Sequence, residues 1–166
     1  MCKILRTYSV LSTDANGWEK RVSLVSWGGK DPKFDIRYWG ENNMPGKGIT
    51  LEQNHLEIIK DVLQTNRKDW NLFQNRTFFS ANCITFENVT CEIIKRYEVL
   101  TEYNSMRKEI NLVLWDGDLA HREDGPKFDI RCWSNDYLNP YKGTTINHEE
   151  AEELIHCLQV INMENL

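Results

Sequence analysis

The chain has 166 residues, of which 40% are apolar and six are tryptophan, and its formal net charge is −5. This composition is typical of a globular protein and excludes a disordered or collagen-like chain. No apolar run approaches the length of a membrane span and no charged-then-apolar signal segment opens the chain, so we expect a cytoplasmic protein with no membrane contact.

Four strands and a helix are predicted in the first 64 residues. β-forming residues, alternating polarity and the turn signals between them place the strands at residues 4–12, 20–27, 33–39 and 47–51. The first hairpin turn is expected at Asp14–Gly17. A helix follows the fourth strand, because apolar side chains recur there at helical spacing, at Leu56, Ile59, Val62 and Leu63.

The sequence of the third predicted strand occurs twice. Pro32–Arg37 recurs without change as Pro126–Arg131, and each copy continues with one variable residue, a tryptophan and, further on, a Lys-Gly pair. The flanking segments also align, Cys2–Ser12 with Cys91–Thr101 and Lys20–Trp27 with Lys108–Trp115. One module is therefore written twice. The prediction is an α+β fold with domains at residues 1–64 and 91–166 and a connector at residues 65–90.

The connector and the end of the second copy complete the predicted elements. Residues 65–90 are too apolar for a flexible linker, so we expect them to pack on the two lobes and to add a strand or a helix. Any exposed part would be a surface for a partner. The second copy ends in a helix whose apolar positions are Ala151, Leu154, Ile155, Leu158 and Ile161.

One face of each predicted sheet carries aromatic and basic side chains. Alternation turns Phe34 and Ile36 toward the helix and leaves the opposite face open. On that open face we expect Trp27, Lys33, Arg37 and Trp39 in the first copy, and Trp115, Lys127, Arg131 and Trp133 in the second. Aromatic planes stack on unpaired bases and cations follow phosphates, so the face predicts single-stranded nucleic acid as the partner.

A structural interpretation of the same residues remains open. Trp27 and Trp39 are also suited to be cross-strand partners that stabilise the sheet or become buried at an interface. The alternation of Lys33, Asp35 and Arg37 is equally typical of an ion-pair ladder on one strand. The pattern alone does not separate the two interpretations.

The motif and its surroundings resemble a known family. Lys-Phe-Asp-Ile-Arg-x-Trp at residues 33–39, then Lys-Gly-Ile-Thr-Leu at residues 47–51 and an amphipathic helix, is similar to the positive-cofactor-four transcriptional coactivators, and most of all to the compact bacterial YdbC-like members. The resemblance implies a curved four-stranded antiparallel sheet followed by a helix, dimerisation through the helices, and binding of single-stranded DNA across the sheets. With both modules in one chain, it implies a monomeric pseudo-dimer.

The resemblance also assigns nucleic-acid contacts residue by residue. They are Trp18, Arg21, Trp27, Lys33, Arg37, Trp39 and Lys47 in the first copy, and Trp115, Lys127, Arg131, Trp133 and Lys142 in the second. The second copy departs from the pattern, because Met106 replaces Trp18, Glu109 replaces Arg21 and Thr144 replaces Ile49.

Charge supports an unequal role for the two copies. Residues 1–64 contain nine Lys and Arg against eight Asp and Glu, whereas residues 91–166 contain eight against fifteen. Because a polyanion is repelled by an acidic surface, we expect the first copy to carry most of the affinity. A role in transcription or DNA metabolism follows from the resemblance.

Other functions find little support in the sequence. The five cysteines are odd in number and lack C-x-x-C spacing, so we expect reduced thiols and no zinc. No phosphate loop or dinucleotide fingerprint occurs, and the loop from Asp116 to Gly125 lacks the final Glu of a calcium site. We therefore expect no enzyme, no cofactor and no metal ion. The alternative function is a protein-interaction module using the acidic second lobe or the connector, and RNA is an alternative to DNA.

Overall fold

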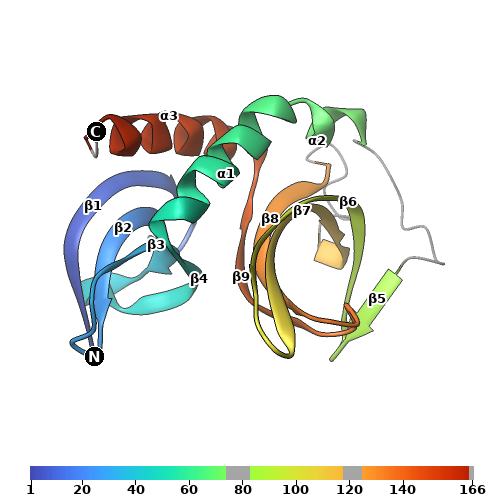
Figure 1. The fold of residues 1–166 in the computed structure, drawn as a ribbon, viewed down its shortest axis with the longest axis horizontal. Helices are drawn as coiled ribbons and strands as arrows, with labels where there is room; N and C mark the ends of the chain where they lie inside the picture. The colour runs from blue at the N-terminus through green and yellow to red at the C-terminus, as the bar shows by residue number, and fades with distance from the viewer. Residues whose placement is uncertain (74–82, 118–124, 165–166) are drawn as a thin grey trace. The chain divides into compact units, whose positions relative to one another are not determined.

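Two antiparallel sheets carry the fold in a computed structural model of the chain, which describes residues 1–73, 83–117 and 125–164 (Figure 1). The first sheet has the order β1-β2-β3-β4, with β1 at Cys2–Thr13, β2 at Glu19–Trp27, β3 at Lys33–Trp39 and β4 at Pro45–Leu51. A 3₁₀ turn, η1 (Glu41–Asn43), joins β3 to β4, and helix α1 (Gln53–Thr65) follows.

The second sheet has five strands. A short helix, α2 (Asp69–Leu72), precedes it, and a longer one, α3 (His148–Glu164), follows it. Its strands, in the order β5-β6-β7-β8-β9, are β5 (Cys83–Phe86), β6 (Val89–Glu102), β7 (Met106–Trp115), β8 (Lys127–Ser134) and β9 (Pro140–Ile146). The prediction of an α+β fold with two β-rich parts is confirmed.

The fifth strand corrects the prediction of four strands in the second copy. Strand β5 comes from the connector and pairs with β6 across a two-residue turn in which Glu87 and Asn88 both have positive φ, 50° and 69°. Two consecutive left-handed residues form the turn that matches the twist of a tight hairpin. The expectation that the connector adds a strand or a helix is confirmed by both β5 and α2.

The two sheets repeat each other down to their irregularities. Strand β1 is shifted against β2 at three places, between Ile4 and Arg6, Thr7 and Ser9, and Val10 and Ser12. The equivalent three places in β6 are shifted against β7 in the same way. Bulges bend a strand and increase its twist, so three in succession explain why both long strands are strongly curved in Figure 1.

The chain divides into two compact units. The first unit is Met1–Leu63 with Glu149–Leu166, and the second is Gln64–His148. Helix α3 therefore belongs by its contacts to the first unit, although it follows the second sheet in sequence. Its Glu150 forms an ion pair with Lys20 of β2 at 3.0 Å, and both side chains are at most 5% exposed. None of the helices among the described residues is long and apolar enough to cross a membrane.

Both faces of the first sheet are buried at their centre. The face that carries Lys20 is turned toward helix α3 and buries Val22, Ile36 and Ile49. On the opposite face Asp35 is 0% exposed and Trp39 is 1% exposed. The expectation of an open second face is therefore wrong at the centre of the sheet, because the side chains of that face pack on one another.

The second sheet is filled in the same way. Cys91, Val113 and Trp133 form a buried cluster on the face opposite Phe128, and Ile84, Ile93, Trp115 and Tyr137 pack against it. Trp133 is 0% exposed. The predicted open face is thus replaced, in both sheets, by a small second core built around the repeated tryptophans.

Candidate nucleic-acid interface

The repeated motif forms a stacked pair of tryptophans. Trp27 of β2 and Trp39 of β3 lie with ring centroids 6.2 Å apart and an interplanar angle of 16°. The Arg37 guanidinium lies over the Trp27 ring, 4.8 Å from its centroid. The second sheet repeats this arrangement with Trp115 and Trp133, whose centroids are 6.4 Å apart. Aromatic pairs of this kind stabilise a fold beyond the area that they bury.

Arg37 is held by the strand that carries it. Its Nε and Nη2 donate hydrogen bonds to the Asp35 carboxylate at 3.0 and 3.2 Å, and its Nη1 donates to the Gly46 carbonyl at 2.8 Å. Arg131 does the same with Asp129 and the carbonyl of Tyr141. Three of the five guanidinium donors are thus committed inside the protein in each copy.

Asp35 is a buried carboxyl with an unusual proton affinity. Removal from water raises its pKa from 3.8 to about 6, and this effect outweighs the opposing hydrogen bond and charge of Arg37. The carboxylate is therefore costly to keep charged and depends on Arg37 as its partner.

Steric contacts explain why the residue after the lysine is glycine in both copies of the motif. A Cβ at Gly48 would lie 2.4 Å from the Ile36 carbonyl oxygen and 2.5 Å from the Cβ of Arg37. Gly143 has the same relation to Ile130 and Arg131, at 2.5 and 2.7 Å. Strand β4 can approach the arginine of β3 this closely only without a side chain.

These contacts support the structural interpretation of the motif, in which its residues are partners of one another. Trp39 and Trp133 do not present ring faces to solvent, so the expectation that they do is wrong. Trp27 and Trp115 are partly exposed at the edge of their stacks. The assignment of all twelve residues as nucleic-acid contacts stays a prediction.

Trp18 and Lys47 are brought together on the surface of the first unit. The Trp18 ring packs on two glycines, since a Cβ at Gly40 or Gly46 would lie 2.7 or 2.8 Å from it. The ring and the exposed Lys47 line one hollow, together with Asp14, Asn16, Tyr38 and Gly46. An aromatic plane beside a lysine is the combination expected for a base and its phosphate.

The hairpin loop that presents Trp18 is held by one aspartate. The Asp14 carboxylate accepts hydrogen bonds from the backbone N–H groups of Asn16 and Trp18, at 2.8 and 3.0 Å. Gly17 completes the turn with a φ of 85°, which a side chain would disfavour. The Asp-Ala-Asn-Gly sequence therefore places Trp18 where the strand β2 begins.

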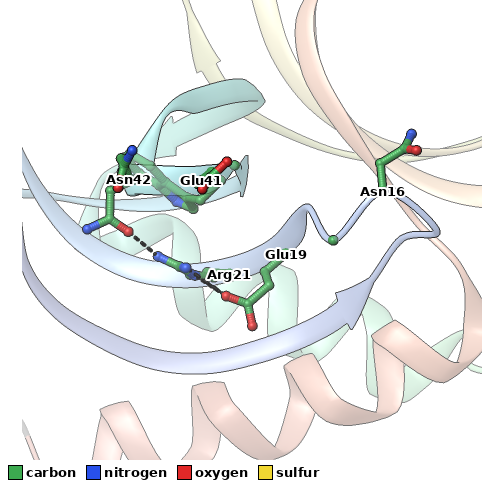
Figure 2. A pocket seen from close by; sticks show the side chains of 9 residues that line it. Asn16, Glu19, Arg21, Glu41 and Asn42 are labelled. Atoms are coloured by element: carbon green, nitrogen blue, oxygen red, sulfur yellow. Dashed lines mark hydrogen bonds and ion pairs between the residues drawn. The ribbon is translucent and has the colours of Figure 1, made fainter.

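Arg21 lines a second hollow (Figure 2). Its guanidinium donates to Glu19 at 2.6 Å and to the Asn43 side-chain oxygen at 2.9 Å. In Figure 2 the Arg21 side chain lies between Glu19 and the turn that carries Glu41 and Asn42. Asn16 lines this hollow and the one beside Trp18, so the two meet at the hairpin loop.

The remaining predicted lysines are scattered. Lys33 lies at the start of β3, where it forms an ion pair with Glu52 at 2.8 Å, and both side chains are about half exposed. Lys142 is exposed on β9 and Lys127 is partly exposed at the start of β8. Lys33 lines neither hollow of the first unit.

The second sheet differs at the two positions that define the first-unit surface. Met106 stands at the position of Trp18, and Glu109 stands at the position of Arg21, paired across the strands with Arg131 as Arg21 is with Arg37. Glu109 is 1% exposed and is bonded by Arg96 and Tyr137. The aromatic and basic surface of the first unit therefore has no counterpart here.

Several residues that line the two hollows were not predicted as contacts from the sequence. Asn16, Tyr38 and Asn43 line the hollows but have no charge or repeated motif to single them out. Asn42 and Asn43 both have positive φ, 56° and 54°, and consecutive asparagines before a Pro-Gly pair were a signal for such a turn.

No group of three or more His, Cys, Asp or Glu side chains within residues 1–73, 83–117 and 125–164 is placed to hold a metal ion. Most of the acidic loop considered as a calcium site, residues 118–124, lies outside the described residues.

Comparison with known proteins gives two findings. The model of the family Transcriptional Coactivator p15 (PC4) matches residues 15–62. An uncharacterized protein from Treponema pallidum (strain Nichols) is 34% identical over 68 residues, which are 40% of this chain and 80% of that protein. The matched residues 15–62 contain Trp18, Arg21 and Lys47, and all residues that line the two hollows of the first unit except Asp14.

Proposed function

Because the chain belongs to the transcriptional coactivator p15 (PC4) family, a family of nucleic-acid-binding or coactivator proteins, we propose that it binds single-stranded DNA as an accessory factor in transcription or DNA metabolism. The observation that carries the proposal is a pair of hollows on the first unit: Trp18 and Lys47 line one, Arg21 lines the other, and Asn16 lines both.

This surface suits a single strand better than a duplex. A duplex hides the faces of its bases, whereas an unpaired base can stack on the half-buried Trp18 ring. Stacking of one base on an aromatic side chain contributes roughly 1–3 kcal/mol. Lys47 and Arg21 then lie on either side of the hairpin loop to attract the phosphates before and after that base.

The first unit carries most of the affinity in this proposal. Its counterpart positions in the second sheet hold Met106, which has no ring, and Glu109, which is acidic and buried. The two sheets repeat one module within one chain, so we also propose that they replace the dimer that a single-module protein would need. The repeated motif supports this role by holding the sheets in shape.

A titration tests the function directly. Labelled single-stranded DNA, double-stranded DNA and single-stranded RNA of matched length are titrated with the full chain at two salt concentrations. We expect tight binding of single strands only, with affinity falling as salt rises, at a log–log slope of roughly −0.7 per phosphate neutralised. Equal binding of duplex, or no binding at low salt, would refute the proposal and favour a protein partner.

A further inference from the structure

The second unit contains a polar cluster on the face where the first unit has Arg21. Its members come from two strands, β6 and β7, and the loop before β9, and they are Arg96, Arg107, Glu109, Asn111 and Tyr137. The Tyr137 hydroxyl bonds the Glu109 carboxylate, and Arg96 and Arg107 lie 4.2 and 5.7 Å from the centroid of the Tyr137 ring. Arg96, Glu109 and Asn111 line a hollow on the surface of this unit.

Tyr137 occupies an unfavourable backbone conformation in order to join this cluster. Its φ is 61°, in the left-handed region that a bulky side chain rarely adopts. The corresponding turn of the first sheet is one residue shorter and has positive φ at Asn42 and Asn43, 56° and 54°, where asparagine is tolerated at little cost. Strain of this kind persists where the surroundings hold it, and it gathers at functional sites.

Asn111 leaves an acceptor unused. The residue is 0% exposed, its Nδ2 donates to Glu109 at 3.1 Å, and its Oδ1 has no hydrogen-bond partner among the described residues. A buried polar atom without a partner is uncommon and needs an explanation. Because Asn111 lines the hollow, a ligand that enters there can supply the missing donor.

Glu109 has acceptor capacity left as well. An ionised carboxylate offers about four lone-pair sites. Asn111, Tyr137 and Arg96 use three of those of Glu109, with the Arg96 Nη2 at 3.3 Å. One site on the carboxylate and the Oδ1 of Asn111 remain, and both side chains are at most 1% exposed, so these two adjacent acceptors become reachable from the hollow only when Arg96 moves off the carboxylate.

We infer that this hollow in the second unit reads a guanine base of the bound single strand. The inference deepens the proposed function and rests on it. Guanine is the base whose Watson–Crick edge carries two adjacent donors, N1–H and the N2 amino group, and a third position, O6, that accepts from an arginine. Thymine would place its carbonyl oxygens against the carboxylate. Arg96, whose side chain is half exposed, is the group that moves when the base enters.

In this proposal the two units have different roles in binding the strand. The first unit binds any base by stacking and phosphate contact, and the second adds a preference at the position where a guanine falls. The exposed Arg96 and the half-buried Arg107 of the second unit attract the adjoining phosphates despite the acidic charge of this part of the chain.

The test uses the full chain and three single strands of equal length. One contains only thymine, one has isolated guanines among thymines, and one has inosine in place of each guanine, which removes the N2 amino group. We expect the guanine strand to bind at least about fivefold more tightly than the thymine strand, since a bidentate base contact discriminates by this factor or more. The inosine strand, which keeps only one of the two donors, should lose most of this gain.

Two variants separate a loss of base preference from a loss of folding. Asn111→Ser introduces the residue of the first sheet, Ser23, and Tyr137→Asn introduces the residue type that has positive φ in the corresponding turn of the first sheet. Each should bind the guanine and thymine strands alike while its affinity for the thymine strand stays unchanged. If the wild-type chain binds thymine and guanine strands equally, the base-reading inference is overturned and single-strand binding stands. If it binds neither strand at low salt, the proposed function fails as well.

Discussion

Arg37 binds the buried carboxylate of Asp35 from two residues further along the same strand, with its Nε and Nη2 at 3.0 and 3.2 Å from the two carboxylate oxygens. Asp35 is fully buried, whereas Arg37 reaches the surface beside Trp27. The identical pair Arg131 and Asp129 occupies the second sheet. A motif repeated without change is in this case a structural unit that each sheet needs.

Removal of Arg37 should therefore destabilise the fold. In Arg37→Met the aliphatic stem stays on Trp27, but the Asp35 carboxyl loses its partner, and breaking a buried pair costs about 3 kcal/mol or more. Urea unfolding at neutral pH measures the loss. The matched control is Lys33→Met, which breaks the half-exposed pair with Glu52 and should cost about 1 kcal/mol or less. Similar losses for both would contradict the structural role.

The buried Asp35 should give the fold a distinctive pH dependence. Because its folded pKa of about 6 lies above the ordinary 3.8, the folded chain retains a proton that the unfolded chain releases. This contribution to stability is fully present below the ordinary pKa and is lost as pH rises through about 6.

The variant Asp35→Asn isolates this effect, because asparagine does not titrate. The free energy of unfolding of the wild-type chain minus that of Asp35→Asn should fall by about 2–3 kcal/mol as pH rises from about 4 to about 7. A rise over the same range would mean that the ion pair with Arg37 outweighs burial.

Strand β4 should tolerate no side chain beside Arg37. Gly48→Ala places a Cβ 2.4 Å from the Ile36 carbonyl oxygen, so the strand must move and stability should fall by about 1–3 kcal/mol. Gly117→Ala is the control, since nothing lies within 4 Å of a Cβ there. Thermal unfolding of both variants compares them, and an unchanged midpoint for Gly48→Ala would refute the close approach.

Helix α3 should depend on its buried ion pair with the first sheet. Lys20→Met leaves Glu150 buried without its cation and should cost about 3–5 kcal/mol, while the double change Lys20→Met with Glu150→Met should recover much of that loss. Arg6→Met breaks the exposed pair with Glu164 and serves as control. If the single and double changes destabilise equally, the helix does not rely on this contact.

Much of the fold could be predicted from the sequence. The repeat, the strands and both helices were readable, because alternation and helical spacing are local signals and the Asp-Ala-Asn-Gly turn has a known geometry. Strand β5 was not placed, since its pairing with β6 depends on the left-handed turn at Glu87 and Asn88 and not on its own pattern.

The site was harder to predict than the fold. Alternation placed Trp39 and Arg37 on the face opposite the helix but says nothing about whether that face is open. That depends on the contacts of Trp39 with Trp27 and of Arg37 with Asp35, which the alternation along a single strand does not decide. Trp18 and Arg21, which were assigned by resemblance, lie on the accessible surface of the first unit, whereas Phe34, Asp35 and Ile36 of the repeated motif are buried.

The central claim is that the first unit binds single strands through Trp18 and Lys47, and one comparison tests it most directly. The affinity for a thymine strand of about 20 nucleotides is measured by fluorescence anisotropy for the double variants Trp18→Ala with Lys47→Ala and Met106→Ala with Lys142→Ala. These pairs occupy equivalent positions in the two copies. We predict that the first weakens binding about tenfold or more and that the second leaves it within about twofold. Equal losses, or a larger loss from the second pair, would contradict the account.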